Sequence, residues 1–368
     1  MLAGDVMLGR GIDQVLPHPG PADIFESHVR SALTYVKLAE ARNGPIPRSE
    51  SFDYVWGDAL ELLEAAAPEC RIVNLETAVT SRGRPEAKGI NYRMAPQNLD
   101  VLAAAEVDCC AIANNHVLDW GPDGLSDTLD ALDGAGLAHA GAGRHPVDAF
   151  APAVLGLRTG GRVLVYGAAH ASAGVPSHWA ASERRAGVAL LPDLSEASAR
   201  RIAERVDDDR QPGDVVVISI HWGPNWGYGI GEQRRFAHSL IDLAGVDIVH
   251  GHSSHHPKGI ERYSGKLILY GCGDLLNDYE GIEGHEQFRP QLALIYLPEM
   301  DRGRTCGLEL LAFRIARFRL HAASPAEVQW LASAIQANSP SLGEHEMALA
   351  ESTFGVRGLA GLSVRFGR

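Results

Sequence analysis

The chain has 368 residues, 45% of them hydrophobic, and a formal net charge of −13 at pH 7. The hydrophobic content excludes wholesale disorder and allows a sizeable core. The acidic balance, with no cluster of Lys and Arg, argues against a nucleic-acid partner. No linker composition interrupts the chain, so we predict a single domain over residues 1–368.

The cysteines and the terminus bear on the cellular compartment. Cys70, Cys109, Cys110, Cys272 and Cys306 form no CxxC pair and mostly lie in apolar runs, which is typical of core residues in a reducing compartment. The chain contains no apolar run of about 18 residues that could form a transmembrane helix. The first residues, "MLAGDVMLGR", lack a signal-peptide pattern. Together these features predict a cytoplasmic protein with no membrane segment.

Short apolar runs alternate with helical patterns along the chain. The runs are rich in Val and Ile and mostly apolar throughout, as in strands that are buried on both faces. The predicted strands are "RIVNLE" (71–76), "DCCAIAN" (108–114), "RVLVYGAA" (162–169), "DVVVISIHW" (214–222), "VDIVHGH" (246–252) and "KLILYGC" (266–272). Helical patterns lie between them at 121–136, 195–209 and 231–245. The alternation predicts an α/β fold.

Two regions depart from this alternation. Residues 17–52 are rich in Pro and polar residues and predict an insertion near the active face, with a helix around 25–41. Residues 300–368 predict C-terminal strands and a helix. Within them, 308–321 alternates like one or two antiparallel strands, and 324–336 begins with a Ser-Pro helix cap.

Side chains that can bind metals stand where five apolar runs stop. They are Asp5 after "MLAG", Asn74 and Glu76 in "NLE", Asn115 and His116 in "NNH", His221 in "HWG", and His250 and His252 in "HGH". Because ligands bind beyond the carboxyl ends of strands in open α/β sheets, we expect these residues to converge. Carboxylate, amide and imidazole groups without a thiolate suit one or two divalent ions of Mn, Fe, Zn or Mg. Taken singly, each residue also fits a turn or helix cap, and the histidine cluster from His250 to His256 also fits a solvated loop.

Several motifs resemble those of a known family. "GDVMLGR", "NLE", "NNHVLDWG", "HWG" and "GHSSH" look like the motifs of the CapA family of capsule-biosynthesis, or poly-γ-glutamate synthesis, proteins, over roughly residues 3–300. That family is similar to the calcineurin-like metallophosphoesterases. The resemblance implies a two-sheet α/β sandwich flanked by helices, with a binuclear metal centre at the strand ends.

The resemblance also implies roles for single residues. The implied metal ligands are Asp5, Glu76, Asn115, His221, His252 and His255. Among them, Asp5 resembles the carboxylate of the first metal and Glu76 the bridging carboxylate. His252 and His255 look like the pair that completes the two coordination shells. His116 resembles the side chain that contacts the substrate or the leaving group.

The chain departs from the phosphoesterase pattern at several positions. Met7 stands where those enzymes keep a histidine, and Glu76 stands where they keep an aspartate. Ser253 and Ser254 separate histidines that are usually one residue apart. The imidazole that is missing at Met7 leaves the first metal with one ligand fewer than in those enzymes. Asp274, in "GCGD", replaces the usual asparagine, and we expect it to orient a ligand imidazole, although a loop acid fits the sequence as well.

These residues predict hydrolytic chemistry. A bound divalent metal can activate water near neutral pH, and His116 can donate a proton to a leaving group. Arg10 could hold an anionic substrate in a fork and assist catalysis, and a surface ion pair is an equal alternative. The further predicted substrate contacts are Asn74, Trp222, Tyr228 and His256. Core packing explains Trp222 equally well.

Two classes of function remain. The first is a metal-dependent hydrolase in which activated water attacks a phosphate ester or a γ-glutamyl-type amide of an anionic substrate. The second is a non-catalytic or assembly role in poly-γ-glutamate or capsule synthesis or export. Export partners usually need a membrane anchor, and none is visible in this sequence, which favours the enzyme.

Overall fold

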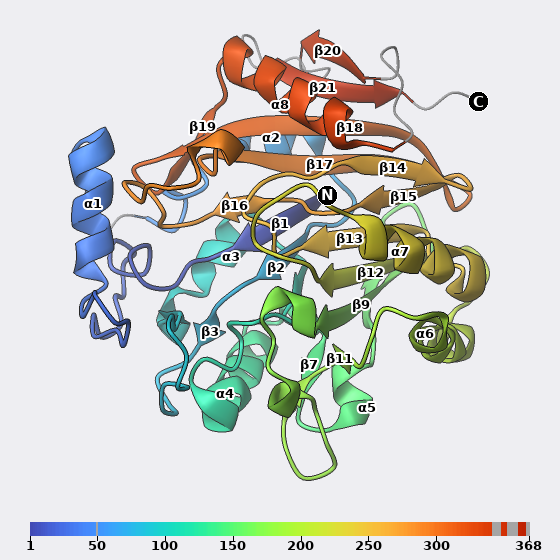
Figure 1. Cartoon of the computed structure of the whole chain (residues 1–368), viewed down its shortest axis with the longest axis horizontal. Coiled ribbons are helices and arrows are strands. Elements are labelled where there is room, and N and C mark those ends of the chain that lie inside the picture. The colour runs from blue at the N-terminus through green and yellow to red at the C-terminus, as the bar shows by residue number, and fades with distance from the viewer. Residues whose placement is uncertain (49–50, 341–346, 352–359, 366–368) are drawn as a thin grey trace.

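Apolar residues that alternate along the strands build two β-sheets, which pack face to face with helices on their outer faces (Figure 1). The computed structural model describes residues 1–48, 51–340, 347–351 and 360–365. Among the described residues, no helix combines the length and the apolar character that a bilayer crossing requires.

The first sheet has ten strands in the order β20-β21-β18-β17-β1-β2-β5-β6, with β16 beside β1 and β19 beside β18. They are β1 (Leu2–Val6), β2 (Ile72–Leu75), β5 (Cys109–Ala111), β6 (Ala138–Ala140), β16 (Asp274–Leu276), β17 (Leu292–Asp301), β18 (Arg304–Ala316), β19 (Arg319–Ala322), β20 (Met347–Glu351) and β21 (Ala360–Arg365). β1 runs parallel to β2 and β16, whereas β17 pairs antiparallel with β1 and begins an antiparallel extension.

The second sheet has seven strands in the order β11-β9-β12-β13-β15-β14, with β8 beside β9. They are β8 (Ala153–Gly156), β9 (Arg162–His170), β11 (Leu190–Leu191), β12 (Val215–His221), β13 (Ile248–His252), β14 (Ile260–Tyr263) and β15 (Lys266–Leu269). Two short pairs join β3 (Ala78–Val79) to β4 (Arg93–Met94) and β7 (Ala142–Gly143) to β10 (Gly187–Val188). The central strands β9, β12, β13 and β15 are parallel.

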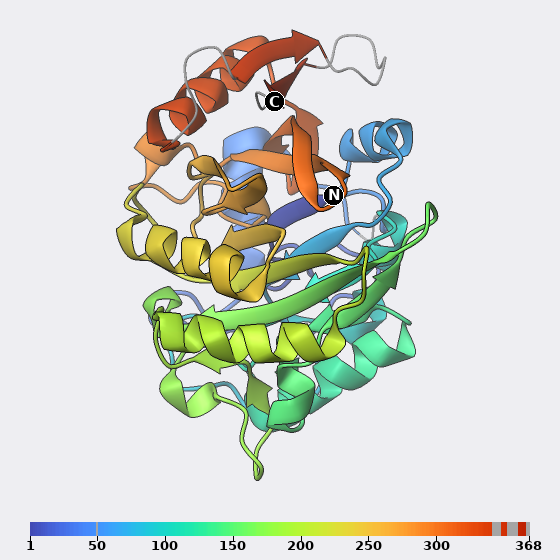
Figure 2. The same cartoon turned by 90° about the vertical axis from the view of Figure 1, so that its right-hand side faces the viewer.

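Helices cover both outer faces. They are α1 (Leu33–Asn43), α2 (Ala59–Ala66), α3 (Asp100–Ala104), α4 (Gly121–Gly134), α5 (Pro146–Ala149), α6 (Glu196–Asp209), α7 (Gly231–Ala244) and α8 (Pro325–Asn338), with short 3₁₀ turns at Pro96–Asn98, Ala171–Ala173, Ser177–Trp179 and Glu286–Phe288. α6 and α7 lie side by side over the second sheet, as Figure 2 shows. α2, α3 and α4 pack against the first sheet.

The side-chain alternation explains this layering. In β17, Leu292, Leu294 and Tyr296 pack toward the second sheet, whereas Ala293 and Ile295 pack toward the outer helices. The strands β9, β12, β13 and β15 alternate in the same way between the sheet interface and α6 and α7. Because both faces are covered, these strands read as continuous apolar runs in the sequence.

The predicted strands are all confirmed, as β2, β5, β9, β12, β13 and β15, and the three central helices are confirmed as α4, α6 and α7. The predicted two-sheet α/β sandwich flanked by helices is also confirmed. Residues 308–321 lie in β18 and β19, and 324–336 lies in α8, where Ser324 and Glu327 form a reciprocal capping box.

The helix predicted around 25–41 begins later than expected, at Leu33. The preceding residues form a closed loop instead, because the amide of Ile24 donates to the carbonyl of Arg30 and the amide of Ala32 donates to that of Ala22. α1 stands on the side toward which the arrows of β12, β13 and β16 point (Figure 1). We therefore retain as a proposal that 17–52 is an insertion near the active face.

The division into domains also stays a proposal. β17 and β18 continue the sheet that contains β1, which supports one domain over residues 1–368. Parts of the predicted segments 17–52 and 300–368, namely 49–50, 341–346, 352–359 and 366–368, lie outside the described residues.

Packing between the sheets can be tested at Leu294, which is 0% exposed. Leu294→Ala should lower the free energy of unfolding by about 2–5 kcal/mol, because it leaves a cavity between two sheets that cannot collapse. Leu33→Ala, at a residue that is 41% exposed, is the matched control and should change it by less than about 0.5 kcal/mol. Denaturant titration measures both, and equal losses would contradict the packing.

Candidate metal centre

The carboxyl ends of strands from both sheets meet at one place. Asp5 of β1 and Asp274 of β16 are paired in register in the first sheet. His221 of β12 and His252 of β13 are paired in register in the second. Two groups of ligand atoms each lie within 4.8 Å of one another: Asp5 with His221 and His252, and Asp5 with His255 and Asp274. Asp5 therefore belongs to both groups.

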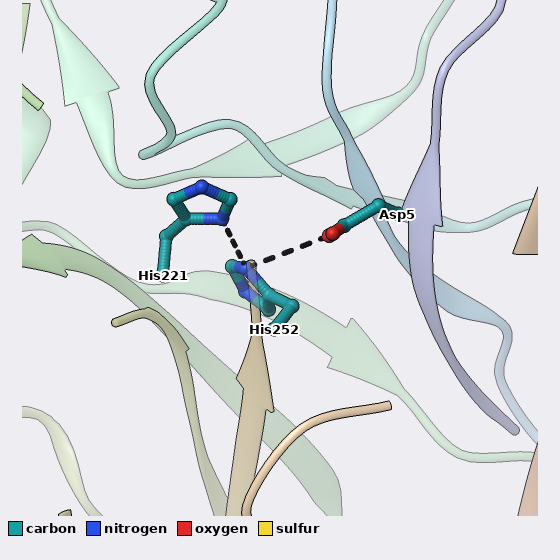
Figure 3. Close-up of side chains that lie close together, drawn as sticks. All are labelled: Asp5, His221 and His252. Atoms are coloured by element: carbon teal, nitrogen blue, oxygen red, sulfur yellow. Dashed lines mark hydrogen bonds and ion pairs between the residues drawn. The ribbon is translucent and has the colours of Figure 1, made fainter. Parts of the chain in front are cut away.

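The first group is built on two facing imidazoles (Figure 3). The Nδ1 atoms of His221 and His252 lie 2.8 Å apart, and His252 Nδ1 lies 4.0 Å from Asp5 Oδ1. Burial lowers the pKa of both histidines well below the usual value. Both rings are therefore neutral at pH 7, which is the form that binds metals.

Hydrogen bonds across the sheet interface fix the protonation of His252. The carbonyl of Ala3 only accepts, so His250 Nε2 donates to it at 2.9 Å. His250 Nδ1 then accepts from the hydroxyl of Ser219 at 3.0 Å, and Ser219 Oγ accepts from His252 Nε2 at 3.0 Å. His252 Nδ1 consequently keeps its lone pair, directed at Asp5 and His221. Ser219 was missed by the sequence reasoning, because an apolar strand gives no sign of a partner on the next strand.

Three carboxylates are buried together at this site. Burial, and then the nearby Asp274, raise the pKa of Asp5 to about 7. Burial, followed by the charges of Asp5 and Asp274, raises the pKa of Glu76 well above its usual value. Glu76 is 1% exposed, and its Oε2 has no hydrogen-bond partner among the described residues. Buried acids of this kind need a cation or a proton.

The donor set fits divalent metals. It joins imidazole lone pairs to buried carboxylates, of which Glu76 Oε2 has no partner among the described residues, and a divalent cation would replace the protons held there. At His255, burial and a neighbouring carboxylate act on the pKa in opposite directions. Burial lowers its pKa, but the Asp274 carboxylate at 2.9 Å more than offsets this, so the pKa of His255 is raised.

His116 lies beside this group and is held by two residues that the sequence reasoning did not assign. Its Nδ1 donates to Asp119 Oδ2 at 2.6 Å, and Lys88 Nζ pairs with Asp119 Oδ1 at 2.7 Å. His116 Nε2 faces Glu76 Oε1 at 3.7 Å. Burial lowers the pKa of His116 to about 4, so the ring is neutral and presents its Nε2 lone pair to the site. The "NNHVLDWG" spacing could have indicated Asp119; Lys88 lies outside any motif.

Three asparagines organise the strand ends. Asn115 Oδ1 lies 3.0 Å from His221 Nε2, on the side of the ring away from His252. Asn74 Nδ2 donates to Asp5 Oδ1 at 2.7 Å, and Asn74 Oδ1 accepts from Asn114 Nδ2 at 3.1 Å. Asn74 was predicted to contact the substrate. Both polar atoms of its side-chain amide are hydrogen-bonded within the protein, and the amide orients Asp5. Asn115 stays a proposed ligand of the second metal.

Arg10 contradicts both readings of its sequence position. The residue is 3% exposed. Its Nε donates to Asp278 at 3.0 Å and its Nη1 donates to Glu26 at 2.7 Å. The guanidinium also lies between the rings of Tyr35 and Tyr92, at 3.8 and 4.3 Å from their centroids. These contacts make Arg10 part of a buried network, neither a surface ion pair nor a free substrate fork. Three of the five guanidinium N–H groups are used by two carboxylates, and the group is buried, so no open fork faces a substrate.

The other predicted substrate contacts also differ. Trp222 is 1% exposed and donates from Nε1 to the carbonyl of Tyr270 at 3.0 Å, so it is a core residue. His256 Nε2 accepts from the amide of Gly227 at 3.1 Å, and this ring is buried against Tyr228, 4.7 Å between centroids. Of these, only Tyr228 keeps partial exposure and stays a proposed pocket residue.

A cavity of about 770 Å³ adjoins the second group. Its lining includes Asn277 and Tyr279. The Tyr279 hydroxyl lies 3.4 Å from His255 Nε2, and Asn277 Nδ2 donates to Asp274 Oδ2 at 2.7 Å. Arg42 and Arg289 line the same cavity. Its lining also contains Glu280, Glu283, Glu286 and Glu327, so the cavity has no positive excess. It is a candidate entrance to the second group that the sequence did not indicate.

Comparisons with known proteins agree with the motif resemblance. Residues 1–279 match the family described as "Bacterial capsule synthesis protein PGA_cap". A "Probable polyglutamine synthesis accessory protein" of Mycobacterium tuberculosis is 47% identical over 348 residues, which cover 93% of this chain and 91% of that protein. The "PGA biosynthesis protein CapA" of Bacillus subtilis is 28% identical over 330 residues, covering 89% of this chain and 72% of that protein.

Among solved structures, similarity is distant. A phosphatase of Mycoplasma pneumoniae aligns with 74% of this chain and 89% of its own, at 12% identity and a TM-score of 0.38. A 5'-nucleotidase precursor of Thermus thermophilus aligns with 60% of this chain and 38% of its own, at 19% identity and a TM-score of 0.31.

Metal content is the first test of this site. Purified protein should carry one to two divalent ions, and excess chelator should lower its melting temperature, because a ligand that binds only the folded state stabilises it. Affinity should fall as the pH drops through about 7, since protons then compete for the Asp5 carboxylate, whereas the lowered pKa values of His221 and His252 keep these rings neutral. Elemental analysis and thermal melts measure this. No bound metal and an unchanged melt in chelator would refute the site.

The hydrogen-bond relay is tested separately by Ser219→Ala. Without the hydroxyl, His252 loses the partner that keeps its proton on Nε2, and metal affinity should fall by roughly 10–100-fold. Ser239→Ala is the control, because that hydroxyl donates only to the carbonyl of Arg235 in its own helix. Titration of metal-free protein with Zn²⁺ gives the affinities, and equal values for both variants would exclude the relay.

Proposed function

The chain belongs to the Bacterial capsule synthesis protein PGA_cap family, and from this premise we propose that it is a divalent-metal-dependent hydrolase acting in capsule or poly-γ-glutamate synthesis. Its relatives are named for that process: a polyglutamine synthesis accessory protein and two CapA proteins. The proposed substrate is anionic, with a phosphate ester or a γ-glutamyl-type amide as the bond that water cleaves.

One observation carries this proposal. The facing Nδ1 atoms of His221 and His252 lie 2.8 Å apart beside Asp5, in a site where Glu76 Oε2 has no described partner. His252 Nδ1 carries a lone pair, and a His221 ring that donates from Nε2 to Asn115 Oδ1, at 3.0 Å, presents a second lone pair from its own Nδ1. A cation between these two nitrogens would remove their repulsion. A group of this composition is suited to Mn, Fe, Zn or Mg.

When bound, divalent metals supply activated water and charge compensation for an anionic reacting group. The chain's own residues supply position. Asn74 and the amide of Ser253 hold the two oxygens of Asp5, at 2.7 and 3.2 Å. The relay through Ser219 holds His252. These contacts fix the ligands before a substrate arrives, which lowers the reorganisation that the reaction requires.

We assign the proton transfer to His116. Its Nδ1 proton is committed to Asp119, so Nε2 is the atom that meets the substrate. An anionic substrate bound next to Nε2 would favour protonation of the ring, which can then pass a proton to the leaving group. Lys88 balances the charge of Asp119. This arrangement favours a catalytic centre over a purely structural metal site, which would need no such residue.

The alternative is a non-catalytic role in the assembly of the polymer. The word "accessory" in the name of the Mycobacterium tuberculosis relative favours it. Under this alternative the metal would stabilise the fold or a binding surface, and His116 would matter only for stability.

Matched histidine variants separate the two functions. His221→Ala should lose metal and hydrolysis together. His116→Ala should keep its metal and lose about 10²–10⁴-fold in rate, because it removes only the proton donor. His139→Ala, whose ring pairs with Asp133 on the surface, should keep both.

The measurements are metal stoichiometry and hydrolysis of phosphomonoesters, phosphodiesters and γ-glutamyl peptides. Full activity of His116→Ala would overturn the assignment of the proton donor. A metal-loaded parent that cleaves nothing on this panel would favour the assembly role.

A further inference from the structure

We propose that Asp274 is itself a metal ligand, and that the centre therefore has two chemically unequal positions. Asp274, Asp5 and His255 form an oxygen-rich position. His221, His252 and the shared Asp5 form an imidazole-rich position. This inference rests on the proposed metal-dependent function, and it replaces the expectation that Asp274 only orients a ligand imidazole.

The strand pairing places Asp274 next to Asp5. β1 and β16 are adjacent parallel strands with these two residues in register, so their side chains leave the same face about 4.8 Å apart. The Asp274 side chain is 0% exposed. Asn277 Nδ2 holds its Oδ2 at 2.7 Å, which directs Oδ1 toward the group.

The distances match those between ligands of one ion. Asp274 Oδ1 lies 2.9 Å from His255 Nδ1, and the ligand atoms of both residues lie within 4.8 Å of that of Asp5. Two ligands bound at about 2.1 Å and at right angles on one metal are about 3.0 Å apart. A metal can thus take the place of the proton that His255 and Asp274 now share.

An orienting role for Asp274 would require His255 to bind the metal through its other nitrogen, Nε2. That atom already accepts from Asn225 Nδ2 at 3.1 Å and lies 3.4 Å from the Tyr279 hydroxyl. Both of these groups lie on the side of the ring away from Asp274. Asn225 and Tyr279 thus occupy the approach to Nε2. For a metal at Nδ1, the ring proton moves to Nε2, where the Tyr279 hydroxyl or the oxygen of a rotated Asn225 amide can accept it, and Asp274 stands beside Nδ1 as a second ligand.

The two positions should select different metals. Two carboxylates and one imidazole favour a harder ion such as Mn²⁺ or Mg²⁺, whereas two imidazoles and one carboxylate favour Zn²⁺. Met7, two residues after Asp5, adds only a thioether, which is a poor ligand for hard ions. Asp274 thus determines whether the oxygen-rich position can hold Mn²⁺.

The test compares Asp274→Asn with the parent and with Asp247→Asn. Asp247 is also 0% exposed and ionically paired, with Arg210 at 3.1 Å, but it precedes β13 and lies at the opposite end of that strand from His252. Metal-free proteins are titrated with Mn²⁺ alone, and bound ions are counted by electron paramagnetic resonance. The Mn²⁺-loaded parent is also crystallised, and its ions are located by anomalous scattering.

The parent and Asp247→Asn should bind two Mn²⁺ ions, and Asp274→Asn should bind one, with the other weakened at least about 100-fold. In the crystal, a carboxylate oxygen of Asp274 should lie about 2.1–2.3 Å from one ion. Unchanged binding by Asp274→Asn, or an Asp274 carboxylate more than about 3.5 Å from either ion, would overturn the inference. A parent that binds no Mn²⁺ or Zn²⁺ would instead overturn the proposed function.

Discussion

The hydrogen bond from His250 Nε2 to the carbonyl of Ala3, at 2.9 Å, is the contact on which the proposed centre depends. It joins β13 of the second sheet to β1 of the first, beside the apolar residues that fill most of the interface. A buried carbonyl and a buried imidazole must both find partners, so this bond limits how the sheets can slide past one another. The same register brings Asp5 to His252, and the same bond begins the relay that leaves His252 Nδ1 free for a metal.

The site is stabilised by its surroundings rather than by its own groups. Burial and the neighbouring carboxylates raise the pKa values of Asp5 and Glu76, which means that the charged forms of these two groups oppose folding. The sandwich can bear this unfavourable free energy because the apolar residues on both faces of the strands fix the strand ends, and with them the positions of the carboxylates. A protein arranged in this way would gain stability from a bound cation, and the proposed metal would then be part of the folded state as well as of the proposed chemistry.

Much of this could be predicted from the sequence. Continuous apolar runs indicated β2, β5, β9, β12, β13 and β15, because a strand covered on both faces needs apolar residues throughout. Polar residues where these runs stop indicated the convergence of Asp5, His221, His252 and His255. The boundary of α1 was predicted less well, because backbone hydrogen bonds that close a loop before Leu33 leave no periodic signal.

The sequence by itself determined the order of the strands along the chain and which polar residues stand at their ends, and parallel strands deliver such ends to one edge. The tertiary structure decided what each polar group touches. Arg10 donates to Asp278 and Glu26, and Trp222 packs in the core. Asp119, paired with Lys88, holds His116, which the sequence did not indicate. Asp274 lies beside Asp5 only because β16 pairs with β1. Such contacts join residues up to about 270 positions apart in the chain, and local sequence cannot specify them, because they arise only when separate strands pack into one register.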